Sequence, residues 1–483
     1  MGVKQFFKDL FKDPPRALKL RNFAGADTCR LLADWILAPI KTRETLKREY
    51  QTLQLRARDL ARNNEFVVGY LKNIRRNVIG DAGFRLVLNT RNAELRRDLQ
   101  AYWDDYTSRA GGYITLDEKS SGRDLDDLIV RTLLVDGEVF LRKVKDPSSP
   151  YLYRWELLDA LDIDYYHNAT LPGGRQIVMG VELDERGREA AYYYRPGNIV
   201  YSTGPLERLD ASEVIHIFRP EEAGQTRGYS PLNAVMKDLE QLDGYRESEI
   251  VRARASADLT AVLQSNGTQG ADALDTETNE RGEFFTEITP GMVKIVPTGY
   301  EFKPFNNGSP NGQFDAFTKS LMRGIANALG VSYPVACGDY SAVNYSSLRA
   351  AALEDRYYFK ELQKFVIEAW KDLEYRLFVE ALEQAGQLSK LEAVEARSHR
   401  FVGRSWSWVD PAKDLQAQKL EYQLLKRDPI SELTADGIDV TAHLDSWAEW
   451  YRLLKERDLP FIDGVFNPSP APVAEEGGNN PNE

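Results

Sequence analysis

The residues best suited to chemistry are three aspartates in one short segment, Asp159, Asp162 and Asp164. Clustered carboxylates collect divalent cations, and metal-dependent nucleases use a cation held in this way. On a strand, Asp162 and Asp164 would point to one face. No Glu-x-x-His pair or second acidic cluster completes such a site. We therefore predict no metal site, and keep a metal-dependent DNA-processing enzyme as an alternative.

Nucleophilic catalysis has less support. The four histidines are His167, His216, His399 and His443, and none lies near a GxSxG turn. The segment Gly228-Tyr229-Ser230-Pro231-Leu232 imitates such a turn, but its serine is better explained as the cap of a following helix. No GxxxxGK loop or GxGxxG turn is present to hold a nucleotide. We predict that the chain is not an enzyme and has no catalytic, cofactor or metal site.

Charge separates the front of the chain from the rest. The 483 residues contain 62 Lys and Arg against 74 Asp and Glu, a net charge of −12, which is the wrong sign for a surface that grips phosphate everywhere. Residues 1–62 carry an excess of basic residues, so 1–45 is expected to be a basic arm, either flexible or docked on an acidic partner. The two cysteines cannot build a disulfide framework, and no stretch is expected to span a membrane.

Periodicity places helices at 43–63, 67–78 and 91–106, with a strand at 84–88. Asp136-Gly137 is typical of a hairpin turn between residues 133–135 and 139–141, and 176–183 is expected to pair with 190–195. Residues 121–220 are therefore predicted to be α+β with antiparallel hairpins.

Ser230-Pro231 begins a helix of about 30 residues, which at 1.5 Å per residue is about 45 Å long. After Tyr245 its side chains are polar or small and include Arg252 and Arg254. Such a helix has too little apolar surface to be held by a core of its own, so neighbouring subunits are expected to contact it.

The second half of the chain is predicted to contain an exposed excursion, two strands and further helices. The excursion covers 264–282, and the strands cover 291–296 and 301–305. A helix at 313–329 and a loop precede a very long helix over 345–384, whose buried face is traced by Leu348, Ala352, Phe359, Leu362, Val366, Trp370, Leu373 and Leu377. Gly386 ends it. Helices are expected to begin at Asp410-Pro411 and Ser431 and to cover 441–457, and the tail from 464 is expected to be disordered.

Four blocks of sequence, in order, resemble the portal proteins of lambda-type tailed bacteriophages. They are RARDLARNNEFVVGYLKNIRRNVIG (56–80), EVIHIFRPEEAGQTRGYSPL (213–232), GVSYPVACGDYSAVNYSSLRAAALEDR (330–356), and DPAKDLQAQ with LTADGIDV (410–418 and 433–440). Together they cover most of the chain, although the two ends and 264–290 depart from the family pattern.

The resemblance implies a dodecameric ring at one capsid vertex of the virion, made from subunits synthesised in the host cytoplasm. Double-stranded DNA would pass through the ring without sequence-specific binding during packaging and ejection. The implied partners are the major capsid protein, the terminase large subunit and head-tail adaptor proteins, with no membrane and no cofactor. The implied fold is α+β, mainly helical, with a wing, a stem, a clip and a crown.

Carried onto this sequence, the resemblance divides the chain as follows: basic arm 1–45, wing 46–229, stem helix 230–262, clip 263–304, second stem helix 305–330, channel loop 331–344, long helix and remaining wing 345–409, crown helices 410–463 and tail 464–483. The place where such proteins narrow the channel matches Val335, Asp339, Tyr340, Ser341 and Asn344. The simpler interpretation is that Asn344, Ser346 and Ser347 cap the long helix.

Two physical arguments agree with a ring. Long helices with polar flanks are covered when identical neighbours surround them, and Arg252, Arg254, Arg349 and Arg356 are expected to pair with acids of a neighbouring chain. A conduit must also let DNA slide, so the channel lining is expected to be mostly acidic or neutral. A different ring-forming head-tail adaptor remains an alternative, although adaptors are usually much shorter.

Overall fold

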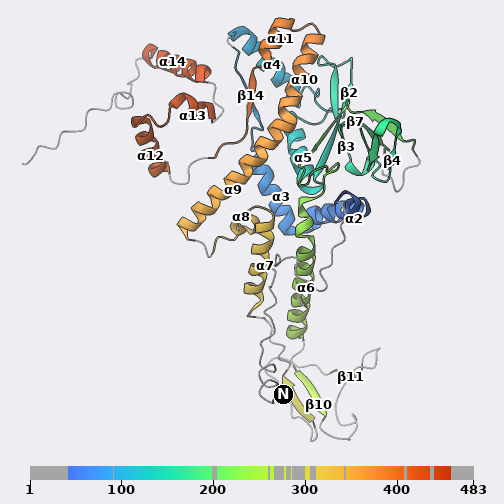
Figure 1. Cartoon of the computed structure of the whole chain (residues 1–483). Helices are drawn as coiled ribbons and strands as arrows, with labels where there is room; N and C mark the ends of the chain where they lie inside the picture. The colour runs from blue at the N-terminus through green and yellow to red at the C-terminus, as the bar shows by residue number, and fades with distance from the viewer. Residues whose placement is uncertain are drawn as a thin grey trace, which may run out of the picture. The chain divides into compact units, whose positions relative to one another are not determined.

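The computed structural model of the chain is mainly helical, with small antiparallel sheets (Figure 1). It describes residues 42–90, 92–197, 204–258, 261–265, 277–278, 284–285, 300–304, 312–341, 344–406, 411–435 and 440–457. The chain divides into two units, Met1–Arg48 and Glu49–Glu483, and every described element except the first turns of α2 belongs to the second. The predicted α+β, mainly helical fold is confirmed.

Helices open the described chain: α2 (Thr42–Asn63), α3 (Glu65–Val78), α4 (Ala93–Thr107) and α5 (Gly122–Val135). Polar side chains begin three of them. Asn64 and Asn92 each accept hydrogen bonds from two backbone N–H groups of the next turn, and Ser121 forms a reciprocal cap with Asp124. These side chains satisfy donors that a helix start leaves without partners. The predicted break between the helices at 43–63 and 67–78 is confirmed, and it falls at Asn64.

Two antiparallel sheets follow. The first has the order β3-β2-β9, from β2 (Glu138–Lys145), β3 (Tyr153–Leu158) and β9 (Val214–Phe218). The second has the order β4-β5-β6-β7-β8, from β4 (Ala169–Thr170), β5 (Gln176–Val178), β6 (Val181–Leu183), β7 (Glu189–Tyr194) and β8 (Glu207–Asp210). A small buried cluster that includes Phe140, Val181 and Tyr192 packs the two sheets together.

The main core is built from segments far apart in sequence. Strand β1 (Arg85–Leu88) pairs with β14 (His399–Val402), which brings the start and the end of this body together. Trp103 of α4 lies edge-on against the rings of Tyr375 and Phe378, with ring centroids 5.5 and 5.1 Å away. These contacts hold the long C-terminal helix against α4.

That long helix runs from α9 (Tyr345–Val366) through a π-helical turn (Ile367–Lys371) into α10 (Asp372–Gln384). It ends where Gly386 adopts a positive φ of 75° and the N–H of Gln387 reaches back to the carbonyl of Leu382, the pattern of a Schellman cap. The predicted continuous helix over 345–384 and its stop are confirmed.

The π turn shifts the buried face by adding a residue to the turn. The predicted core positions Phe359, Leu362, Val366 and Trp370 are buried, whereas Leu348 and Ala352 near the start of α9 are only half-buried. Beyond Trp370 the buried residues are Glu374, Tyr375, Phe378, Val379 and Leu382, whereas Leu373 and Leu377 are only half-buried. The prediction of one regular α-helical stripe was wrong in this second half.

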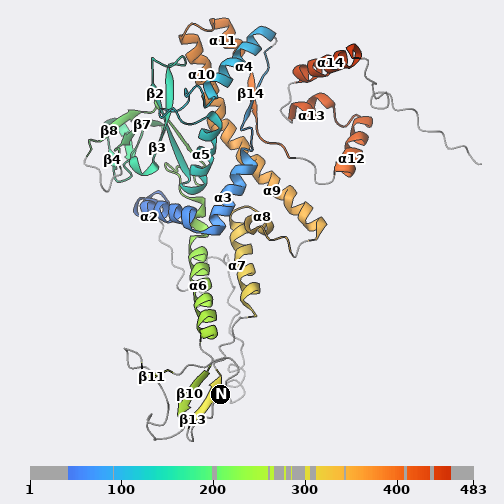
Figure 2. The same ribbon diagram turned by 180° about the vertical axis from the view of Figure 1, so that it is seen from behind.

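The two helices α6 (Met236–Asp258) and α7 (Phe314–Ala328) lie side by side in both views (Figure 2). Tyr245 of α6 joins them, because its ring lies 5.5 Å from the ring of Phe314 and 5.2 Å from that of Phe317. The root of α6 is fixed to α3, where Asn64 donates to Asp243 at 2.7 Å. Further along, α6 exposes apolar side chains, as expected for a helix without a core of its own.

Several sequence-based boundaries were wrong. Residues 133–135 end helix α5 instead of forming a strand, because their apolar side chains continue the helical spacing of Leu125 and Ile129. The segment 176–183 is two strands, β5 and β6, joined by a tight turn, and only β6 pairs with β7 as predicted. The first stem helix is shorter than predicted: a 3₁₀ turn (Pro231–Ala234) precedes α6, which ends at Asp258.

Strand β10 (Ala261–Ser265) follows and pairs with β13 (Tyr300–Pro304), so 261–262 was wrongly assigned to the stem helix. Within the predicted excursion, β11 (Glu277–Thr278) pairs with β12 (Phe284–Phe285). The predicted loop 331–344 contains the short helix α8 (Tyr333–Cys337). The strand at 291–296, the tail from 464 and residues 1–41 of the basic arm lie outside the described residues.

Four shorter helices complete the described chain: α11 (Lys390–Ala396), α12 (Pro411–Gln423), α13 (Pro429–Ala435) and α14 (Val440–Glu456). The last three confirm the helices expected after residue 410. Among the residues that the structure describes, no helix is both long and apolar enough to cross a membrane.

Candidate functional site

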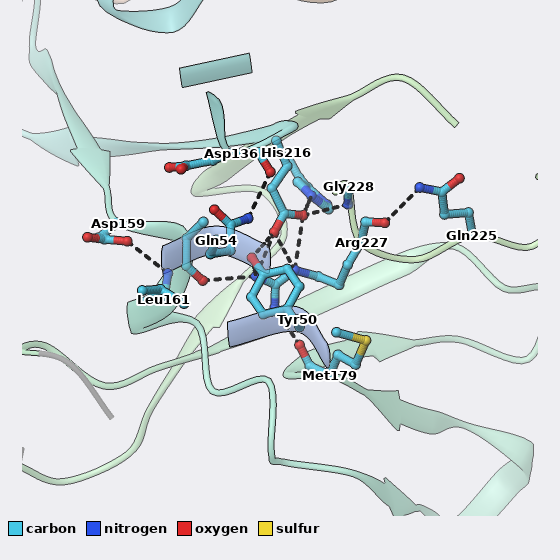
Figure 3. Close-up of polar contacts among 12 residues, drawn as sticks. Tyr50, Gln54, Asp136, Asp159, Leu161, Met179, His216, Gln225, Arg227 and Gly228 are labelled. Carbon is cyan, nitrogen blue, oxygen red and sulfur yellow. Dashed lines mark hydrogen bonds and ion pairs between the residues drawn. The ribbon is translucent and has the colours of Figure 1, made fainter. Parts of the chain in front are cut away.

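A buried ion pair lies at the centre of the most heavily bonded polar cluster, drawn in Figure 3. Glu138 begins β2, and Arg227 lies in the segment between β9 and α6; both side chains are completely buried. The guanidinium donates to both carboxylate oxygens of Glu138, at 2.9 and 3.0 Å from Nε and 2.7 Å from Nη2. A charge buried without such a partner would be strongly destabilising.

Arg227 also contacts the surrounding elements. It donates to the backbone carbonyls of Met179 at 2.7 Å and Ala160 at 2.9 Å, and to the hydroxyl of Tyr50 at 2.6 Å. Its guanidinium carbon lies 4.7 Å from the Tyr50 ring and 5.1 Å from the Phe140 ring. Helix α2, both sheets and the root of α6 therefore meet at one side chain (Figure 3).

His216 of β9 extends the cluster to the second sheet. Its Nε2 lies 3.0 Å from Glu138 and its Nδ1 lies 2.8 Å from Glu189 of β7. Burial opposes the charged form, but hydrogen bonds to the two carboxylates raise the pKa of His216 and so favour the imidazolium, in which both ring nitrogens can donate. Burial likewise opposes ionisation of Glu138, but Arg227 and His216 lower its pKa to about 2.

The same segment includes a backbone contact that only glycine permits. The N–H of Gly228 donates to Glu138 at 2.8 Å. A Cβ at Gly228 would lie 2.3 Å from the carbonyl oxygen of Gly137, and one at Gly137 would lie 2.0 Å from that of Tyr229. Two residues further on, Ser230 accepts from the N–H of Leu232 and starts the turn that leads into α6.

The segment 213–232, singled out by sequence, joins the sheets to helix α6. Its two ends, around Val214–Ile217 and Thr226–Ser230, are largely buried, and residues 219–224 between them are exposed. The buried part around Arg227 and Gly228 is suited to positioning elements of the fold. Glu138 was missed by sequence reasoning, although an acid directly before the apolar run Val139-Phe140-Leu141 was a signal that it needs a buried partner.

The three aspartates do not form a cation site. Asp159 is ion-paired to Arg58 at 2.6 Å and caps a 3₁₀ turn (Ala160–Asp162), and Asp164 is ion-paired to Arg195 at 3.1 Å. Asp162 lies in that turn and not on a strand, so the predicted shared face with Asp164 was wrong. Within the described ranges, no group of three or more His, Cys, Asp or Glu is placed to hold a metal ion.

The predicted channel-loop residues have different surroundings. Val335 lies in α8, where its carbonyl accepts from Asn73 at 2.7 Å. Asn344 caps α9 through the N–H of Ser347 at 2.8 Å, which agrees with the simpler interpretation. Tyr340 is exposed, with 52% of its surface accessible.

Asp339 turns back toward the chain. Its carboxylate accepts from the backbone and hydroxyl of Ser341, at 3.0 and 2.6 Å, and from the hydroxyl of Tyr333 at 3.1 Å. These hydrogen bonds, chiefly those from Ser341, lower the pKa of Asp339 to about 2. The carboxylate also lies 3.8 Å from Nζ of Lys319 on α7. Asp339 therefore ties the loop to α7 and α8.

The four arginines predicted to contact neighbouring subunits lie on two helices. On α6, Arg252 is paired with Glu249 at 2.7 Å, and Arg254 is exposed. On α9, Arg349 and Arg356 are half-buried, and neither is without an interaction. Their contact with another chain stays a prediction.

A second buried charge cluster escaped sequence reasoning. Lys371, in the π turn, lies 2.5 Å from Glu374 and 3.3 Å from Asp126 of α5, and the indole of Trp370 donates to Asp126 at 2.8 Å. One cation faces two acids in a dry core. Burial, reinforced by the charge of Asp126, raises the pKa of Glu374 to about 7 despite Lys371. The π turn places Lys371 in the core, and the apolar periodicity of the sequence did not indicate this position.

Comparisons with known proteins agree with the sequence blocks. The family described as "Phage portal protein, lambda family" matches residues 28–363. A "Probable portal protein" of Halomonas phage phiHAP-1 is 27% identical over 433 residues, covering 86% of this chain and 82% of that protein. "Portal protein B" of Escherichia phage lambda is 26% identical over 350 residues, covering 64% and 65%. A chain from the neck of an empty gene transfer agent particle aligns with a TM-score of 0.46 at 16% identity, covering 81% and 94%.

Replacing Arg227 with methionine, which is similar in length but neutral, should leave Glu138 as a buried charge with a lost partner. We expect the free energy of unfolding, measured by urea denaturation, to fall by about 3–5 kcal/mol. The matched control is Arg186→Met, because Arg186 is exposed on a turn; its effect should stay within about 0.5 kcal/mol. Equal effects of the two substitutions would contradict the central role of Arg227.

The raised pKa of Glu374 predicts a pH dependence. The native protein keeps a proton that the unfolded chain releases above about pH 4.5, so this stabilisation is complete below that pH and is lost as pH rises to about 7. The contribution should decline by about 1.4 kcal/mol per pH unit in that window. Glu374→Gln mimics the protonated side chain and should remove this part of the slope in pH-dependent denaturation. An unchanged slope would show that Glu374 is already ionised.

Proposed function

Since the chain belongs to the lambda family of phage portal proteins, we propose that twelve copies of it close into a ring around a DNA channel. Family membership makes the chain a virion protein of the portal vertex, where portal proteins form ring oligomers and serve as the conduit for DNA packaging. The match over residues 28–363 carries this conclusion. The number twelve, the channel lining and the individual partners are the proposal.

Exposed apolar side chains on α6 support a ring. Ile250 and Val251 are 50% and 56% exposed in the single chain, beyond the point where Tyr245 contacts α7. On α9, Tyr357 is 69% exposed. Apolar surface left open on two long helices is covered when copies pack side by side, and burial contributes about 25 cal/mol for each Å² removed from water.

The stem, clip and crown can be assigned to elements of the structure. We assign the stem to α6 and α7, the clip to the segment that begins with β10 and ends with β13, and the crown to α12, α13 and α14. The wing takes the sheets and the helices packed on them. In this assignment the clip would engage the terminase large subunit and later the head-tail adaptor proteins, and the wing would face the major capsid protein.

The proposed channel lining, α7 with the loop after α8, has little uncompensated positive charge. Lys319 is paired with Asp315 at 2.9 Å and lies near Asp339, and the guanidinium of Arg323 lies 5.6 Å from the Tyr333 ring. Fewer free cations mean fewer counterions released from DNA and weaker attachment. Such a lining would let DNA slide in either direction. It also suits a structural protein without enzymatic activity.

Electron microscopy of the purified protein tests the ring. We expect annular particles with twelvefold symmetry in top views, and an Ile250→Glu/Val251→Glu variant should shift the protein toward smaller species in size-exclusion chromatography with light scattering. Leu391→Glu changes an apolar residue on α11 that is more exposed still, at 83%, and should leave assembly unchanged. A wild-type protein that stays monomeric at high concentration would contradict the proposal.

Asp315→Asn tests the channel lining, because it removes the main partner of Lys319 in every subunit of a ring. The variant rings should bind double-stranded DNA more tightly than wild-type rings, and the affinity should fall more steeply with salt. Glu185→Gln makes the same charge change at an exposed turn of the second sheet and serves as the control. Identical salt dependence for Asp315→Asn and the wild type would place Lys319 away from DNA.

A further inference from the structure

A small cavity of 340 Å³ opens where the end of α2 meets the end of α5. Carbon atoms of Leu157 and Leu158 form part of its wall, and polar groups supply the rest: Arg58, Arg62, Arg131, Thr132, Asp136 and Asp159. Three guanidinium groups converge on it from two helices. Neither the joint around Arg227 nor the stem uses this cavity.

All three guanidinium nitrogens of the first arginine, Arg58, donate hydrogen bonds within the chain. Arg58 donates to Asp136 through Nε at 3.0 Å and Nη2 at 2.8 Å, and to Asp159 through Nη1 at 2.9 Å and Nη2 at 2.6 Å. Asp136 and Asp159 therefore share one cation, which offsets one of their two negative charges. These three side chains have a net charge of −1, and the two remaining arginines at the cavity bring the total to +1.

The other two arginines have no such partners. Neither Arg62, exposed in the last turn of α2, nor Arg131, half-buried on α5, makes an ion pair or a side-chain hydrogen bond with the described part of the chain. Thr132 also lines the cavity. With three arginines against two aspartates, the cavity has a net charge of +1, and two of its guanidinium groups make no ion pair within the described residues.

We propose that this cavity receives a carboxylate side chain from a neighbouring copy of the chain. A guanidinium fork binds a carboxylate through two parallel hydrogen bonds, and two forks at one cavity would hold it from both sides. The volume suits the end of a side chain. The inference rests on the proposed ring, which places a second copy beside each subunit.

Charge favours a second copy over nucleic acid as the source. The chain has 74 acidic against 62 basic residues, so its own surface is an abundant source of carboxylates. A DNA phosphate would instead be followed by further phosphates of the same strand, and the cavity lining has no further cations to receive them. A single carboxylate brings one negative charge, which matches the net charge of +1 at the cavity.

Reversing the two free charges tests the contact. Arg62→Glu/Arg131→Glu should raise the protein concentration needed for half-maximal ring formation by about tenfold or more, since even 1.4 kcal/mol per contact is a factor of ten. The matched control, Arg186→Glu/Arg188→Glu, reverses two exposed arginines elsewhere and should change it less than twofold. Thermal unfolding of the dissociated subunits should be the same for the variant and the wild type, which separates assembly from folding.

A chemical cross-link identifies the partner. Arg62→Lys/Arg131→Lys keeps both charges and supplies amines that a carbodiimide couples to a touching carboxylate. We expect rings of this variant to yield linked dimers on denaturing gels, with Lys at 62 or 131 joined to an Asp or Glu of another copy by mass spectrometry. Dissociated subunits should yield none.

Two results would overturn the inference: normal assembly of the double Glu variant, or a cross-link confined to Asp136 or Asp159 of the same chain. If the normally assembling variant also binds inorganic phosphate or a DNA duplex more weakly than the wild type does, the cavity is a phosphate site. Ring formation by the wild-type protein is measured before any variant is compared. Its failure would instead contradict the proposed function.

Discussion

The pairing of Glu138 with Arg227 is the interaction on which the rest of the fold depends. A carboxylate and a guanidinium removed from water are costly unless each finds its partners, and here the partners come from α2, from both sheets and from the segment that leads into α6. Each of these elements is therefore held in place relative to the others, because moving one of them would leave a buried charge without its partners. The apolar contacts around Phe140 and Tyr192 add cohesion, but they would tolerate several arrangements, whereas a guanidinium with fixed donors permits one.

This constraint explains how a helix with little apolar surface can still have a defined direction. At its root, Leu239 and Leu242 are buried and Asp243 accepts from Asn64, so the start of α6 is fixed by the body. Arg246 adds an ion pair to Glu65 of α3. Beyond Arg246 the helix depends on its own backbone and on α7. A rod that is firmly rooted and sparsely covered is well suited to a ring, because neighbouring copies add contacts without having to orient it.

The sequence predicted those features that depend on local signals. The break between the helices predicted at 43–63 and 67–78 and the stop at Gly386 were placed correctly because caps act within a few residues. Ser230 caps a 3₁₀ turn that precedes α6, and not the long helix itself. Residues 133–135 were assigned wrongly because a tight-turn pair was weighed above the helical spacing that reaches back to Leu125. The face of the long helix was predicted only as far as Trp370, since a π turn leaves no periodic trace. The cluster around Glu138 depends on residues 88 and 89 positions apart, which no local pattern connects. Of the proposed loop residues, Tyr340, Ser341 and Asn344 are exposed, and Val335 and Asp339 are half-buried.

The contact between Gly137 and Gly228 limits which substitutions the two positions can accept during evolution. In most cores, a larger side chain at one site is offset by a smaller one nearby. Here the obstacle to any added carbon is main-chain oxygen at both positions, so no second substitution makes room. Both glycines must therefore be retained, or the backbone of the two segments must change its path. In descendants too diverged to align, two glycines flanking a buried acid and a buried arginine would outlast the surrounding residues and serve as a fingerprint for finding them.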